Sequence, residues 1–214
     1  MKLYLVEPRR VSDIENSWFK PKYDGMEHIL LFIDHANVFH NLEKRHIRID
    51  FGKFKDIIAK NRRLINALIY MGLMKDLKEK KQHFLEYLEE AGFKIQERPV
   101  KIAQDGTKKQ AGMDVLIYKD ITESAEEDFY DKAVLVSGDE DFVYAVERIK
   151  ELGKEIEIWS FKDSLSYKLM QEAGEENIHY IDDILDKITI KVKSTPTSPR
   201  EKLGSRAQDK KSGV

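Results

Sequence analysis

The chain has no cysteine among its 214 residues, and this absence removes several classes of site. Disulfide bridges, thiolate-bound zinc and cysteine nucleophiles are all excluded. No run of apolar residues approaches the roughly 18 that a membrane-spanning helix requires. The first six residues are followed at once by charged side chains, which makes the apolar stretch too short for a signal peptide. We therefore expect a soluble, cytoplasmic protein with no membrane partner.

Net charge is also low, but it is divided unevenly along the chain. The formal net charge is −2. From Lys187 onward, eight lysines and arginines stand against two acidic residues, which gives +6 for this segment and −8 for residues 1–186. We predict an N-terminal extension over 1–26, one domain over 27–186 and a basic, disordered tail over 187–214. The tail suits either loose attraction to the phosphate backbone of RNA or a solubilising role.

Strand and helix patterns alternate through the central part of the sequence. Apolar runs at 28–34, 64–71, 132–136 and 155–160 predict buried strands. The remaining expected elements are helices 36–45, 51–61, 75–91, 140–152 and 164–173, a helix from about Met113, and strands 93–100 and 178–181. This alternation predicts an α/β domain with a mostly parallel central sheet and right-handed crossovers.

Two acidic residues follow the strand at 132–136. Ser137 and Gly138 come first, and Asp139 and Asp141 then fall in the loop and first turn of the next helix. The glycine allows a sharp backbone turn at this point. Sites in parallel α/β sheets form at the carboxyl ends of the strands. An N-cap role would explain one of the two carboxylates, but not both.

Further acidic residues occupy comparable positions elsewhere. Asp34 ends the apolar strand 28–34, and Asn37 follows one helical turn later. Here too, capping of the following helix is the alternative role for Asp34. Asp114 precedes an apolar helical segment, whereas Asp120 points about 240° away from it on a straight helix. We therefore expect Asp114 to lie at the site and Asp120 to be structural or to support it.

Converging carboxylates without basic partners are typical of sites for hard divalent cations. Their oxygen atoms are the ligands that Mg²⁺ and Mn²⁺ prefer. Asp34, Asp114, Asp139 and Asp141 are accordingly the candidate metal ligands. Repulsion among four close carboxylates would be relieved when such an ion binds.

Three segments in this order resemble the NYN domain, a branch of the PIN-like metal-dependent ribonucleases. They are FIDHAN at 32–37, KKQAGMD at 108–114 and LVSGDEDF at 135–142. The resemblance covers roughly residues 26–185 and implies a three-layer α/β/α fold. It also implies that the four aspartates bind metal and act in catalysis, and that Asn37, Lys109 and Ser137 contact the substrate or lie near the metal. Members of the family often have Lys-Gly directly before the hydrophobic-Asp pair, but here Gln110 and Ala111 separate Lys109 from Gly112.

The resemblance and the residues together predict hydrolysis of RNA phosphodiester bonds with Mg²⁺ or Mn²⁺, with water as the nucleophile. A non-catalytic NYN module that binds RNA or a protein partner is the main alternative. A phosphatase of the haloacid dehalogenase type would need a second aspartate where Ala36 stands. A nucleotide-binding Rossmann protein would need a glycine-rich turn, and residues 34–37 contain no glycine.

Aromatic residues and histidines complete the expectations. Three aromatic side chains in the segment 12–25 either pack on the domain's own surface or form a homodimer contact. His35, next to Asp34, is a weak candidate for contact with substrate. We expect five phenylalanine side chains to be buried in the core: Phe32, Phe39, Phe51, Phe54 and Phe142.

Overall fold

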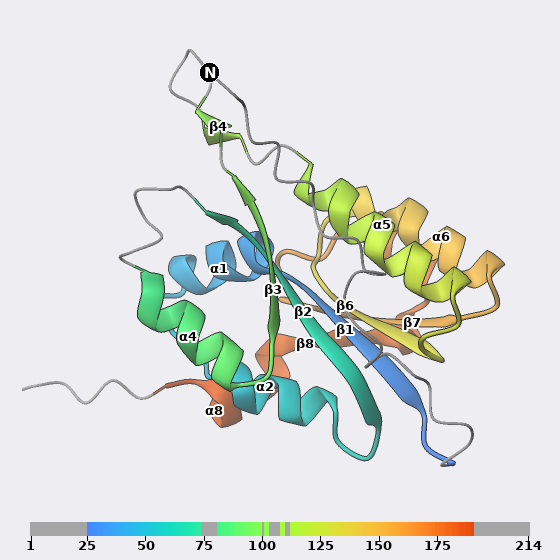
Figure 1. Ribbon diagram of the computed structural model, residues 1–214, viewed down its shortest axis with the longest axis horizontal. Coiled ribbons are helices and arrows are strands. Elements are labelled where there is room, and N and C mark those ends of the chain that lie inside the picture. Colours follow the sequence, from blue (N-terminus) through green and yellow to red (C-terminus); the bar gives the residue numbers. More distant parts are fainter. Residues whose placement is uncertain (1–24, 74–80, 100, 103–107, 110–111, 191–214) are drawn as a thin grey trace, which may run out of the picture.

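Six parallel strands form the central sheet of the described chain (Figure 1). The computed structural model describes residues 25–73, 81–99, 101–102, 108–109 and 112–190. In space the strands follow the order β3-β2-β1-β6-β7-β8. Their bounds are β1 His28–Asp34, β2 Arg63–Leu73, β3 Lys94–Pro99, β6 Lys132–Val136, β7 Glu155–Ser160 and β8 Ile178–Tyr180. The predicted parallel sheet is therefore confirmed. A small antiparallel pair, β4 Lys101–Ile102 and β5 Lys108–Lys109, lies apart from it.

Helices cover both faces of the sheet and give three layers (Figure 1). One face is packed by α1 His35–Lys44, α2 Phe51–Ile58, α4 Gln82–Glu90 and α8 Leu185–Ile188. The other is packed by α5 Met113–Glu126, α6 Val143–Glu151 and α7 Tyr167–Ala173. Short 3-10 turns are η3 Glu140–Phe142, η4 Glu175–Asn177 and η5 Ile181–Ile184. The three-layer α/β/α architecture is confirmed.

Strand β1 shows why this sequence forms a central strand. Leu30 and Phe32 belong to the core on the α5–α6 side, whereas Ile29, Leu31 and Ile33 belong to the core on the α1–α2 side. All five side chains are fully buried. A strand covered on both faces must be apolar throughout, and the side chains alternate between the two cores.

Several boundaries differ from the predicted ones. The helix expected at 140–152 begins as the turn η3 before α6, because the Asp139 side chain caps a tight turn there. The helix expected at 164–173 begins only at Tyr167. The chain also remains structured beyond residue 186: α8 contributes the buried Ile188, whose carbonyl oxygen accepts a hydrogen bond from the Asp50 amide at 2.8 Å.

One predicted core residue is wrong, and some predictions lie outside the described residues. Phe32, Phe51, Phe54 and Phe142 are buried, but Phe39 is 43 % exposed. Its ring stacks on His35 and belongs to neither core cluster. The aromatic segment 12–25 and the tail from residue 191 fall almost entirely outside the described part of the chain. Among the described helices, none is long and apolar enough to cross a membrane.

Candidate metal-binding site

The candidate site lies where the two halves of the sheet meet. β1 and β6 are adjacent in the sheet, and Ile33 pairs with Val136. The chain runs from β1 outward to β2 and β3 on one side, and from β6 outward to β7 and β8 on the other. Such a switch point leaves a crevice outside the carboxyl ends of the central strands, which is where ligands bind in open α/β sheets. Asp34 ends β1, and Ser137 to Asp141 follow β6.

Asp34 links the two halves of the site. Its Oδ1 accepts hydrogen bonds from the amides of Ala36 at 3.1 Å and Asn37 at 3.2 Å, so it does cap α1. Its Oδ2 accepts a hydrogen bond from the Ser137 hydroxyl at 3.1 Å. The carboxylate therefore has a second role, in which it ties the end of β1 to the loop after β6.

The Asp34 carboxyl group is buried and hard to ionise. Its pKa is raised from the ordinary 3.8 to about 6. Burial is the main cause, the negative charges of Asp114 and Asp139 add to it, and the hydrogen bonds from Asn37 and Ser137 oppose it. Because the side chain is only 5 % exposed, water cannot compensate its charge. A bound cation could.

The loop after β6 is held by a compact set of hydrogen bonds. The Asn37 Oδ1 accepts a bond from the Gly138 amide at 3.3 Å, and the Asp139 amide donates to the Ser137 hydroxyl at 3.3 Å. The Gly138 carbonyl oxygen accepts from the Ser166 amide at 2.8 Å. The loops after β1, β6 and β7 are thereby fixed to one another.

Glycine at position 138 is required by close packing. A Cβ atom there would collide with the Ser164 carbonyl oxygen and would lie 2.5 Å from the Ser160 hydroxyl. Ser160 ends β7 and is buried. Sequence reasoning did not single out Ser160 and Ser164. A small polar residue at the end of an apolar strand, as at Ser137, was the signal that could have found Ser160.

The other three aspartates lie within electrostatic reach of one another. Asp139 is half-buried, and its Oδ1 accepts a hydrogen bond from the Asp141 amide at 3.1 Å. Asp141 and Asp114 are exposed. The pKa of Asp114 is raised, first by partial desolvation and then by the charges of Asp139 and Asp141. Together with Asp34, these residues form one acidic cluster, in which each of the four interacts with at least one other.

No basic side chain neutralises this acidic cluster within the described part of the chain, since none of the ion pairs found there involves the four aspartates. Among the described residues, no group of three carboxylate or imidazole side chains lies at the spacing that holds a metal ion. The donors are nevertheless the hard oxygens that Mg²⁺ and Mn²⁺ prefer. Two of the carboxyl groups have raised pKa values, which a cation would lower. The residues present thus fit a divalent ion, with Asp34, Asp114, Asp139 and Asp141 as its candidate ligands.

Two further residues from the sequence analysis are Asp120 and Lys109. Asp120 does not join the acidic cluster: it is buried on α5 and accepts a hydrogen bond from the Tyr70 hydroxyl at 2.8 Å. Burial raises its pKa to about 6. The backbone of Lys109 lies in β5, opposite Lys101, and the position of its side chain is outside what the structure describes. Its role remains a prediction.

Comparison with known proteins identifies the family. The family model for the NYN domain matches residues 28–182. The chain belongs to the NYN domain family. This match includes both strand ends that carry Asp34 and Asp139 and the helix that carries Asp114. NYN domains have a nuclease-like fold, are generally metal-dependent and typically bind RNA.

A solved structure agrees with this fold. A crystal structure of a protein of unknown function from Vibrio parahaemolyticus superposes with a TM-score of 0.65 at 27 % sequence identity. The alignment covers 79 % of this chain and 99 % of that one. No curated protein matches the chain.

Proposed function

We propose that this NYN domain is a metal-dependent endoribonuclease that hydrolyses RNA phosphodiester bonds at the acidic cluster. The observation that carries the proposal is the convergence of four carboxylates, without a described basic partner, at the switch point of the sheet. An acidic site can accept a polyanion only if cations separate the two. A divalent ion at this position, Mg²⁺ or Mn²⁺, would supply a water of lowered pKa and would neutralise charge on the phosphate oxygens.

The chain's own residues divide into ligands and positioning groups. Asp34, Asp114, Asp139 and Asp141 would hold the ion. Ser137 is fully buried and its hydroxyl bonds to both Asp34 and the Asp139 amide, which supports a role in fixing these two acids.

Asn37 is the better candidate for contact with RNA. Its Oδ1 bonds to Gly138, whereas its Nδ2 makes no hydrogen bond to another described residue. That group can donate to a phosphate oxygen. Lys109 would add a positive charge near the substrate, as the family resemblance implies.

RNA cleavage tests the proposal directly. Purified protein should cleave single-stranded or loop RNA with Mn²⁺ or Mg²⁺ and should stop when chelator is added. Asp34→Asn and Asp141→Asn should each lower the rate by about two orders of magnitude or more, because each removes a charged ligand from the ion. The matched control is Asp56→Asn, which removes the same charge from an exposed position on α2 and should leave cleavage unchanged.

The opposite outcome points to the alternative function. If the wild-type protein binds metal and RNA but leaves a broad panel of RNAs intact, the chain is a non-catalytic RNA-binding module. Equal cleavage by wild type and Asp141→Asn would instead indicate a contaminating nuclease.

A further inference from the structure

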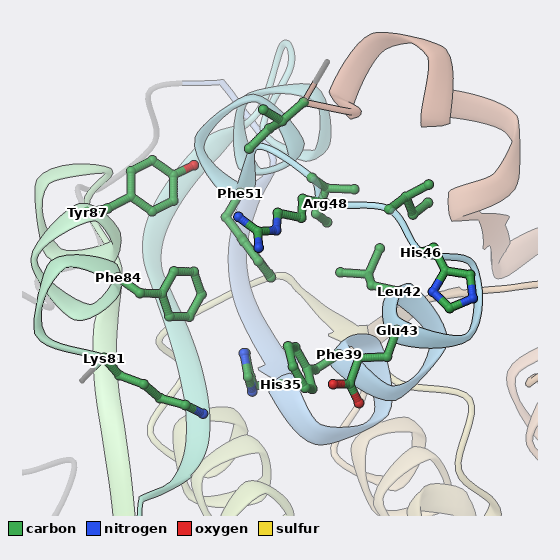
Figure 2. Close-up of a pocket in the computed structure, with 13 residues that line it drawn as sticks. His35, Phe39, Leu42, Glu43, His46, Arg48, Phe51, Lys81, Phe84 and Tyr87 are labelled. Atoms are coloured by element: carbon green, nitrogen blue, oxygen red, sulfur yellow. The ribbon is translucent and has the colours of Figure 1, made fainter. Parts of the chain in front are cut away.

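A cavity lies beside α1, on the sheet face covered by α2 and α4 (Figure 2). Its volume is about 1060 Å³, which is at the upper end of the size range of small-molecule sites. Its walls come from α1, the loop that follows it, the start of α2 and α4, with Ile190 at one edge. The acidic cluster lies outside this cavity, because none of the four aspartates lines it.

Aromatic rings dominate the wall of the cavity. Figure 2 shows His35 and Phe39 side by side on α1, with Phe84 facing them from α4. The rings of His35 and Phe39 are stacked at 5.4 Å, and the Phe84 ring lies 5.8 Å from His35. Phe51 closes the inner side at 6.3 Å from His35. Phe39 remains 43 % exposed although it belongs to this group of rings, so part of its ring surface is open to a ligand.

A buried polar atom in the wall has no partner. The His35 side chain is only 7 % exposed, and its Nε2 makes no hydrogen bond to any described residue. Such an atom loses its bonds to water without replacement, which is unfavourable unless a ligand bonds to it. A ligand with ring nitrogen or carbonyl groups would meet this need.

Positive charge lies at the mouth of the cavity. The Lys81 Nζ is 5.8 Å from the centre of the Phe39 ring, and Arg48 lines the opposite side. Neither forms an ion pair with another described residue. Glu43 is the acidic member of the lining, and His46 also belongs to it. Two permanent cations against one anion favour a flat ring that carries a phosphate.

The cavity adjoins the acidic cluster through α1. His35, which lines the cavity, directly follows Asp34 in the chain, so their Cα atoms are about 3.8 Å apart. Two residues later, Asn37 bonds back to Gly138 at the acidic site, and Phe39 returns to the cavity. One helix turn therefore contacts both places.

We infer that this cavity, the aromatic pocket, binds a nucleobase of the RNA strand whose phosphodiester lies at the acidic cluster. The base would stack on the exposed part of the Phe39 ring and place its phosphate near Lys81. This inference rests on the proposed function, since it names how that same substrate is held.

Measuring the binding of mononucleotides in the presence of chelator tests the pocket independently of the metal site. The probes are AMP, GMP, CMP and UMP, with ribose 5-phosphate as the base-free control, titrated into the full chain by calorimetry in EDTA. At least one mononucleotide should bind, and ribose 5-phosphate should bind at least tenfold more weakly. Phe39→Ala should weaken binding by about 5- to 150-fold, the range for loss of one base–aromatic stack.

Further variants test whether Phe39→Ala weakens binding through loss of the ring or through a change in the fold. Phe39→Tyr should retain binding, whereas Phe39→Leu, which keeps most of the volume but not the ring, should behave like Phe39→Ala. Tyr144→Ala removes another exposed ring, 71 % accessible on α6, and should leave binding unchanged. Far-ultraviolet circular dichroism and melting curves establish that each variant is folded.

The possible results distinguish failure of the nucleobase pocket from failure of the proposed nuclease activity. Cleavage of RNA with no binding of any mononucleotide, or binding that Phe39→Ala and Phe39→Leu leave intact, overturns the pocket and spares the nuclease. Equal binding of ribose 5-phosphate and nucleotides overturns base recognition. Ring-dependent nucleotide binding without RNA cleavage supports the pocket and rejects the nuclease.

Discussion

Replacing Asp34 by asparagine should stabilise the metal-free protein at neutral pH, although Asp34 caps a helix. Asparagine caps as well as aspartate does, so its Oδ1 can keep the bonds from the Ala36 and Asn37 amides. Its Nδ2 can donate to the Ser137 hydroxyl, which now donates to Asp34. The substitution therefore removes the charge and retains the local geometry.

The magnitude follows from the pKa of the buried carboxyl group. The folded protein holds the Asp34 proton with a pKa of about 6, against an ordinary value of 3.8. Because the folded-state pKa is the higher one, the contribution of Asp34 to stability is fully present below about pH 4 and is lost as the pH rises through about 6. The difference corresponds to about 3 kcal/mol. For a domain of this size, that is roughly 6–12 °C in melting temperature.

Melting curves in EDTA between pH 4.5 and 7.5 measure this effect. The difference in stability between Asp34→Asn and wild type should grow with pH over that range. Asp120 titrates in the same window but is present in both proteins, so its contribution cancels. Adding Mg²⁺ or Mn²⁺ should raise the melting temperature of the wild type and leave the variant almost unchanged, because binding to the native state stabilises it by mass action.

A second capping aspartate provides the matched control. Asp50 caps α2 by accepting a hydrogen bond from the Lys53 amide, and that bond is the largest of the effects that lower its pKa. Asp50→Asn should therefore give no gain at neutral pH, or a small loss. If Asp34→Asn also lowers stability at pH 7.5 in EDTA, the Asp34 carboxylate is not destabilised by its surroundings and the electrostatic argument for a cation fails.

Three further predictions concern the loop after β6 and the tail. In chelator, the melting temperature of Asp139→Asn should match or exceed that of the wild type. Asp139→Ala removes the side chain that caps η3 and should lower the free energy of unfolding by about 0.5–2 kcal/mol. Equal melting temperatures of the two variants would contradict this. Gly138→Ala should abolish cleavage and lower stability by more than 1 kcal/mol, because the added Cβ meets the Ser164 carbonyl oxygen; wild-type melting and cleavage would refute the packing argument. Deleting residues 191–214 removes seven basic and two acidic residues and should flatten the salt dependence of RNA binding while sparing turnover at saturating RNA; an unchanged salt slope would rule out a role for the tail.

The central sheet and three of the four acids were predictable because one pattern specifies both. An apolar run that ends in a polar residue defines a strand buried on both faces and marks its carboxyl end. Asp34 and the Ser137–Asp141 segment satisfy this pattern, and parallel strands bring such ends to one edge. Asp114 was expected at the site because it directly precedes an apolar helical segment, and the family resemblance implied the same role.

Packing between distant elements was not predictable in the same way. Phe39 and Phe84 occur at positions that resemble the core-facing stripe of a helix, and Phe39 was wrongly assigned to the core. Its exposure depends on how α1 packs against α2 and α4, which periodicity within one helix does not specify. The contact of Gly138 with Ser160 and Ser164 likewise depends on the order of β6 and β7 in the sheet.

The cluster's electrostatic strain and its proposed chemistry have one origin. The Asp34 carboxylate could lie in a polar, solvated loop at little energetic cost, but it is buried at the junction of β1 and β6 beside two other acids. Three hydrogen bonds fix its orientation without removing its net charge. Natural proteins retain such local instability where a ligand relieves it. A cation that binds here relieves the repulsion that destabilises the cluster, so removing the metal from the wild-type protein should lower its melting temperature.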